Sequence, residues 1–145
     1  MQKEGFAIST ETSFFNLEYI HEFLSNSYWA GNIPIETVQK SIDNSICFGV
    51  FHLGRQIGFA RVITDKTTFA YLADVFIDEA YRGQGLSKWL MEEIMNHEDL
   101  QGLRRFMLAT RDAHGLYTKF GFSALTNTDR WMQIHNPDIY KSSAD

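Results

Sequence analysis

An apolar run, a glycine turn and a helical pattern follow one another between residues 71 and 90. Residues 71–77 are apolar apart from Asp74 and predict a strand. After the turn, apolar residues recur at helical spacing at Leu86, Trp89, Leu90 and Ile94. The first backbone N–H groups of such a helix have no partner within it, and the positive end of its dipole lies there, so the turn attracts an anion. This order of elements therefore predicts a phosphate or pyrophosphate site.

The residues of the turn favour the same kind of ligand. Gly83 and Gly85 have no Cβ atom that would block a close approach, and Arg82 and Lys88 add positive charge. A Walker A loop fits poorly, because it ends in Gly-Lys-Ser/Thr whereas here Lys88 follows a serine. A dinucleotide-binding fingerprint also fits poorly, because Lys88 stands where its third glycine is required.

The segment from Arg82 to Ser87 resembles the pyrophosphate loop of the GNAT superfamily of acyl-coenzyme A dependent N-acetyltransferases. The family usually has glycine or alanine where Ser87 stands, and serine is also small. A second match lies downstream, where Leu116-Tyr117 and Gly121-Phe122 are similar to the family's C-terminal signature, together with Ala113 before them. Two motifs at the expected mutual spacing are more specific than either alone.

The resemblance implies acetyl-coenzyme A as the cofactor. It implies that a local irregularity parts the strand at 71–77 from the strand around Phe106, which frees backbone groups of Val75 and Ile77 to bond the pantetheine arm and the thioester carbonyl. Thr110 stands where many members carry an asparagine that bonds the pantetheine, and a hydroxyl can substitute for it. The implied cofactor-binding residues are Val75, Phe76, Ile77, Arg82, Gly83, Gln84, Gly85, Leu86, Ser87, Lys88, Thr110, Ala113 and Tyr117.

Two residues are candidates for the chemistry. By the resemblance, the Tyr117 hydroxyl lies near the thioester sulfur and donates a proton to the departing thiolate; the alternative is a core tyrosine in a short helix. Asp74 is an unusual carboxylate in an apolar strand, and alternation places it on the face opposite Val75 and Ile77. It is interpreted as a base, as an anchor for a cationic amine, or as a hydrogen-bonded structural acid.

The acceptor pocket has two further candidates. Tyr28 and Trp29 lie in a loop, where they either form a wall of that pocket or pack beneath the loop. The five histidines show no metal-ligand spacing, so no metal is predicted.

Composition limits the remaining possibilities. A chain of 145 residues with 44% hydrophobic content predicts one domain over residues 1–145. The net charge of −5 argues against a nucleic-acid surface, and Cys47 is alone, which excludes a disulfide framework. The sequence begins without the apolar run of a signal peptide, and no run approaches the roughly 20 residues that span a bilayer. We therefore expect a cytoplasmic protein, either monomer or homodimer, that binds no membrane.

The predicted fold is α/β (α+β), and the resemblance implies a GNAT-like architecture. It has a central, mixed but mostly antiparallel sheet of about six or seven strands, splayed at the cofactor site and flanked by about four helices. Periodicity and turn residues predict strands at residues 4–9, 45–53, 57–64, 69–77 and 105–110, with a hairpin at 54–56. Two more short strands are predicted within residues 123–134.

The predicted activity is transfer of an acetyl group from acetyl-coenzyme A to a primary amine of a small molecule or peptide, by direct attack on the thioester with Tyr117 as general acid. The alternative is a GNAT-like sensor or interaction module that binds coenzyme A without catalysis. A pure binder does not need the tyrosine, and thiol release with a panel of amines separates the two.

Overall fold

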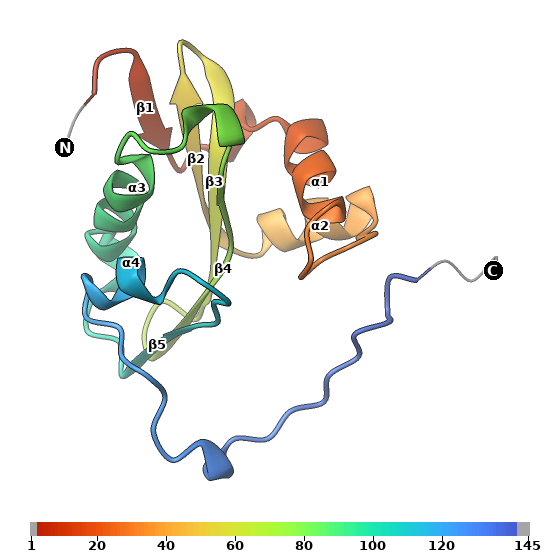
Figure 1. Cartoon of the computed structure of the whole chain (residues 1–145), viewed down its shortest axis with the longest axis vertical. Helices are drawn as coiled ribbons and strands as arrows, with labels where there is room; N and C mark the ends of the chain where they lie inside the picture. The colour runs from red at the N-terminus through yellow and green to blue at the C-terminus, as the bar shows by residue number, and fades with distance from the viewer. Residues whose placement is uncertain (1–2, 142–145) are drawn as a thin grey trace.

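The computed structural model describes residues 3–141 and contains one mixed sheet with helices on both of its faces (Figure 1). Its elements in chain order are β1 (Phe6–Ser9), α1 (Leu17–Ser25), α2 (Ile35–Asp43), β2 (Ile46–His52), β3 (Arg55–Thr64), β4 (Phe69–Ile77), α3 (Leu86–Met95), β5 (Arg105–Leu108) and α4 (His114–Thr118).

The sheet order is β1-β2-β3-β4-β5, so neighbours in sequence are neighbours in space. All pairs are antiparallel except β4 with β5, which is parallel because α3 crosses between them. The mixed, mostly antiparallel sheet is confirmed. The β2–β3 hairpin turns on Leu53-Gly54, both at positive φ, and not on residues 54–56 as predicted.

The predicted number of strands was wrong. The sheet has five strands within the described residues, and residues 123–134 hold no strand there, only a short 3-10 turn at Thr128–Arg130. Figure 1 shows this segment leaving the sheet in an extended course. A strand needs a neighbour to pair its backbone N–H and C=O groups, and an alternating sequence does not say where that neighbour is.

Two apolar clusters hold the layers together. Along β3, Phe59 faces α1 and α2, whereas Ala60 faces α3, so successive residues enter opposite clusters. Because both faces are covered, the central strands are apolar almost throughout, which explains the weak alternation of their sequences. None of the helices among residues 3–141 combines the length and apolar character that a bilayer span needs.

Cys47 lies on β2 beneath α2, where it is 2% exposed and its thiol donates a long hydrogen bond of 3.8 Å to the Ile42 carbonyl. Burial raises the pKa of the thiol from its ordinary 9.0 to about 12, because the thiolate loses its hydration there. The folded pKa is above the unfolded one, so the stability linked to this group is complete below pH 9 and is lost as the pH rises toward 12.

We therefore expect the melting temperature of the protein to fall between pH 9 and about 11. The melting temperature of the variant Cys47→Ala should fall less steeply over the same range, because alanine does not titrate. Thermal unfolding of both proteins at pH 7 and across the alkaline range measures this. The difference in melting temperature between the two proteins at pH 7 gives the effect of the lost side-chain volume, and it is subtracted from the differences at higher pH. Parallel declines would assign the alkaline loss to other groups.

Candidate active site

The sheet opens where β4 and β5 diverge. Their parallel pairing runs from Phe69 opposite Arg105 to Leu72 opposite Leu108, and β4 then continues to Ile77 without a β5 partner. The edge of β4 from Ala73 to Ile77 is therefore left uncovered on that side. The sequence resemblance implied such an opening, and the irregularity that accompanies it lies within β4.

That irregularity is a β-bulge at Asp74. In the pairing with β3, Phe76 stands opposite Phe59 and Ala73 opposite Arg61, so two residues of β4 face a single residue of β3. Asp74 has a φ of 56°, in the left-handed region that side chains other than glycine rarely adopt. Aspartate tolerates this conformation better than most residues because its short polar side chain finds hydrogen bonds nearby.

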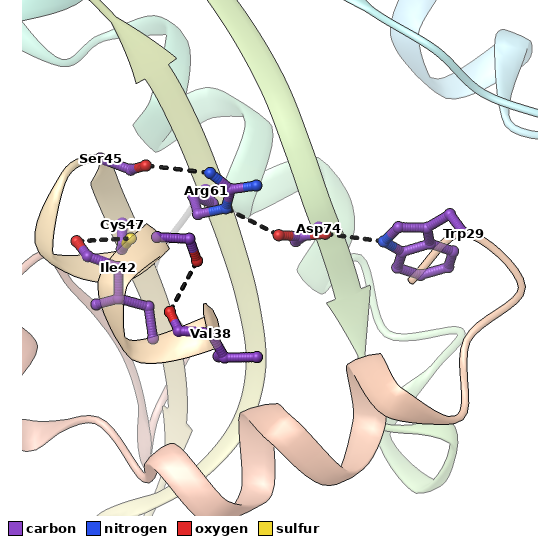
Figure 2. Close-up of polar contacts among 8 residues, drawn as sticks. Trp29, Val38, Ile42, Ser45, Cys47, Arg61 and Asp74 are labelled. Carbon is purple, nitrogen blue, oxygen red and sulfur yellow. Dashed lines mark hydrogen bonds and ion pairs between the residues drawn. The ribbon is translucent and has the colours of Figure 1, made fainter. Parts of the chain in front are cut away.

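Figure 2 shows the partners of the Asp74 carboxylate. One oxygen accepts a hydrogen bond of 2.8 Å from the indole N–H of Trp29, and the other accepts one of 2.8 Å from Nε of Arg61. Arg61 also donates from Nη1 to the Ser45 hydroxyl at 3.2 Å. The Arg61 and Asp74 side chains are 17% and 9% exposed, so this ion pair is mostly withdrawn from water.

The predicted pocket residues Tyr28 and Trp29 come together with Asp74 at this point. The two rings meet edge to face at 5.1 Å between centroids, and the guanidinium of Arg111 lies 3.9 Å above the Tyr28 ring. This cation–π contact ties the loop after β5 to the loop between α1 and α2. Both rings remain partly exposed, which fits a wall better than a packed core.

The sequence interpretation missed Arg61 and Arg111. The sequence did contain an indication for Arg61. A single cation in the apolar run of β3 needs an acidic partner if it is buried, and Asp74 is the single acid in the apolar run of the next strand. The sequence next to Arg111 contains no comparable indication that its partner is an aromatic residue at positions 28–29.

Tyr117 lies in α4 and is 8% exposed. Its ring meets Phe122 edge to face at 6.1 Å, and the Phe122 N–H returns to the Tyr117 carbonyl at 3.3 Å to close the helix. Burial is the larger cause that raises the pKa of the phenol, and the nearby Tyr28 adds to it. The hydroxyl therefore stays protonated at neutral pH, which is the state a proton donor needs.

Thr110 lies just before this helix, and its hydroxyl oxygen accepts a hydrogen bond of 3.0 Å from the Ala113 N–H. That bond shapes the turn into α4 and occupies one acceptor site of the hydroxyl. The hydroxyl hydrogen is still able to donate to a ligand. Thr110 and Ala113 thus form one turn, and Ala113 is the N-cap residue of α4.

The glycine loop leads into α3 as predicted. Gly83 and Gly85 have φ values of 80° and 79°, and Gly85 is the N-cap residue of the helix without a side-chain cap. The first turn of α3 contains no acidic residue, so the positive end of the helix dipole is not neutralised there. Arg82 ties the loop to β4 through a hydrogen bond of 3.1 Å from Nε to the Ile77 carbonyl.

The outer side of the same loop is fixed by Lys3, whose Nζ donates to the Gln84 side chain at 2.8 Å. Leu86 is buried and anchors the helix, whereas residues 82–85 are exposed. An exposed loop with free helical N–H groups, nearby cations and no carboxylate in the first turn suits an anion such as a pyrophosphate.

Comparison with known proteins identifies the family. Residues 43–124 match the family model described as the acetyltransferase (GNAT) domain. A protein of Gibberella zeae assigned as an acetyltransferase is 33% identical over 137 residues, which cover 79% of this chain and 76% of the relative. The chain therefore belongs to the GNAT family of acetyltransferases.

Solved structures agree with this assignment. A protein of Xanthomonas campestris pv. campestris, assigned to the same family, is 49% identical and has a TM-score of 0.92, covering 94% of this chain and 97% of its own. A GNAT acetyltransferase from Elizabethkingia anophelis, determined with acetyl-CoA bound, shares the fold with a TM-score of 0.63 at 14% identity, covering 83% of this chain and 78% of its own.

The contacts of Asp74 generate a stability prediction. Asp74→Asn keeps a side chain suited to the left-handed bulge but leaves Arg61 without its counter-charge, so we expect the free energy of unfolding to fall by about 3 kcal/mol. Asp74→Ala should cost about 1–2 kcal/mol more, because alanine does not offset the left-handed conformation. Urea unfolding of the three proteins measures both differences.

The matched control is Ser45→Ala, which removes the other polar partner of Arg61 and should cost about 1 kcal/mol. Equal losses for the asparagine and alanine variants would show that the bulge does not depend on the aspartate side chain. An unchanged asparagine variant would show that the ion pair contributes nothing.

Proposed function

We propose that the protein transfers an acetyl group from acetyl-coenzyme A to a primary amine of a small molecule or peptide. The observation that carries this proposal is the position of Tyr117, a buried phenol in α4 close to Tyr28 in the loop after α1. A protein that only bound the cofactor would have no use for a protonated hydroxyl held in this position. The family membership of the chain supports acyl transfer as the reaction class.

The cofactor is assigned to the opening and the glycine loop. Residues Arg82 to Lys88 and the start of α3 offer their N–H groups and cations to the pyrophosphate. The pantetheine arm runs along the uncovered edge of β4 at Val75, Phe76 and Ile77, with Thr110 and Ala113 across from it. A thioester carbonyl only accepts hydrogen bonds, so its partner on this edge is a backbone N–H group, and the Ile77 carbonyl accepts from Arg82 instead. The acetyl-CoA bound by the Elizabethkingia anophelis relative supports this choice of cofactor.

The reaction consists of one displacement. The neutral amine attacks the carbonyl carbon, a C–N bond forms, and the C–S bond breaks as the tetrahedral intermediate collapses. Tyr117 gives its proton to the leaving thiolate, and the amine loses one proton to solvent. Tyr117 is therefore assigned as the general acid.

Asp74 is assigned to the acceptor pocket as a positioning residue. Its two oxygens each accept a hydrogen bond, one from Trp29 and one from Arg61, so the carboxylate holds the indole in place. Trp29 and Tyr28 then form the wall against which the amine lies. If this is right, Asp74→Asn raises the KM for the acceptor and leaves the affinity for coenzyme A unchanged, an effect that lost stability alone does not produce.

The direct test is the release of free thiol from acetyl-coenzyme A in the presence of a panel of primary amines, including polyamines, amino acids, aminosugars and short peptides. We expect turnover with at least one class. Binding of the cofactor without turnover on the whole panel would favour the non-catalytic module.

Gly85→Asp tests the glycine loop. Aspartate and asparagine tolerate the left-handed conformation of Gly85 better than other side chains, so the variant should fold. Its charge lies where the pyrophosphate is expected, and we expect a loss of coenzyme A affinity of at least 100-fold. Gly85→Asn is the control, since it adds a similar side chain without the charge and should lose less. Calorimetric titration measures both affinities. Normal coenzyme A affinity in a folded Gly85→Asp protein would show that the pyrophosphate does not bind at this loop.

Tyr117→Phe tests the general acid. The variant keeps the ring and its contact with Phe122, so coenzyme A should bind as before while turnover falls by roughly 10²–10⁴-fold. His114→Ala, on an exposed position one turn earlier in α4, should leave turnover within a few-fold of the unmodified protein. Undiminished turnover in Tyr117→Phe would show that Tyr117 serves packing and not proton transfer.

A further inference from the structure

The aromatic wall formed by Tyr28 and Trp29 ends at an arginine whose charge is not neutralised. Arg111 follows β5, and its guanidinium lies 3.9 Å from the centroid of the Tyr28 ring. Within residues 3–141 this cation–π contact is the only side-chain interaction that Arg111 makes. No carboxylate of that part of the chain forms an ion pair with it, not even Asp112, the next residue.

The other charge beside the wall is already compensated. Asp74 accepts a hydrogen bond from Trp29 and forms an ion pair of 2.8 Å with Arg61, mostly withdrawn from water. The ion pair carries no net charge, so it offers little attraction to an acceptor with several positive charges. Arg111 therefore supplies the uncompensated charge at the wall. That charge is positive, although the chain as a whole carries a net charge of −5.

The side chain of Arg111 is prepared to bind an anion. A cation–π contact engages the charge of the guanidinium but none of its five N–H donors. These donors form a planar fork that matches the oxygens of a carboxylate or a phosphate. Because the Tyr28 ring already restricts where the fork lies, less side-chain entropy is lost when an anion binds. Arg111 is exposed, so an anion reaches it from solvent.

Arg111 also lies close to the groups that are proposed to react. Figure 1 shows the loop after β5 and the loop between α1 and α2 reaching toward each other from the two sides of the sheet. After burial, the nearby Tyr28 is the second cause that raises the pKa of Tyr117. One ring thus neighbours both an unpaired cation and the proposed general acid.

We propose that the amine acceptor also carries a carboxylate or phosphate group, and that the Arg111 guanidinium binds this group beside Tyr28. The inference rests on the proposed function and narrows it to one class of acceptor. Polyamines, which offer no anion, are then poor acceptors. Arg111 holds the acceptor away from the bond that forms, so its main effect is on the KM for the acceptor and not on kcat.

Matched pairs of amines test this preference. The members of a pair differ in the anionic group, as do β-alanine and β-alaninamide, or O-phosphoethanolamine and ethanolamine. Thiol release should give a higher kcat/KM for the anionic member of at least one pair, and the pair with the larger ratio distinguishes a carboxylate from a phosphate. Faster turnover of the members without the anion, or of polyamines, would refute this inference and leave the proposed function standing.

Variants of Arg111 test whether this residue is the cause. Arg111→Ala should raise the KM for the anionic acceptor by about 10–100-fold, the usual weight of hydrogen bonds to a charged group, and leave coenzyme A affinity unchanged. Arg111→Lys keeps the charge without the fork and should lie between. Lys119→Ala, which removes an exposed cation from the turn that ends α4, is the matched control and should keep the KM. An unchanged KM in Arg111→Ala would overturn the proposal.

A binding measurement separates this inference from the proposed function. The indole N–H signal of Trp29, whose ring meets Tyr28 edge to face, is followed by NMR with and without coenzyme A, and Trp29→Phe assigns it. O-phosphoethanolamine or β-alanine should shift the signal saturably, whereas ethanolamine and β-alaninamide should not, and Arg111→Ala should abolish the shift.

The outcomes of the two kinds of measurement are distinct. A saturable shift without turnover on any amine would refute the proposed function and keep the anion site. Absence of the shift in the unmodified protein, or an equal shift in Arg111→Ala, would overturn the anion site, whatever the turnover.

Discussion

The ion pair between Arg61 and Asp74 supports the arrangement on which the site depends. It offsets the left-handed backbone of Asp74, and the bulge so formed lies two residues beyond the last pairing of β4 with β5. Arg61 is itself held by Ser45, which directly precedes β2, and Asp74 holds Trp29 from the loop after α1. One carboxylate thus links β3 and β4 to the aromatic loop between α1 and α2.

Two different environments lie beside the uncovered edge of β4. At one end of the uncovered β4 edge is the N-terminus of α3, where N–H groups, Arg82 and the absence of a first-turn carboxylate produce a positive potential. At the other end is Tyr117, whose burial keeps its proton in place. The proposed cofactor carries a charged pyrophosphate far from its thioester, and the bulged edge of β4 lies between these two environments.

The local parts of this site were predictable because their determinants are adjacent in sequence. The glycine turn and the start of α3 form one short stretch, as do Tyr117 and the residues that close α4, and each motif contains the residues that shape its own backbone. The two strands predicted within residues 123–134 fail for the opposite reason. An alternating apolar segment is compatible with a strand, but the ladder depends on a partner that sequence order does not specify, and no partner lies beside it within residues 3–141.

The sequence by itself predicted the family, through the resemblance of two motifs, and the glycine turn that leads into α3, because both rest on residues that are close together along the chain. The tertiary structure decided the partners of Asp74. Its donors are 13 and 45 residues away along the chain, and strand alternation could indicate only its face. The same holds for Arg111 above Tyr28. Hydrogen bonds and cation–π contacts act over a few ångströms, so their partners are set by how strands and loops pack and not by any periodicity of the sequence.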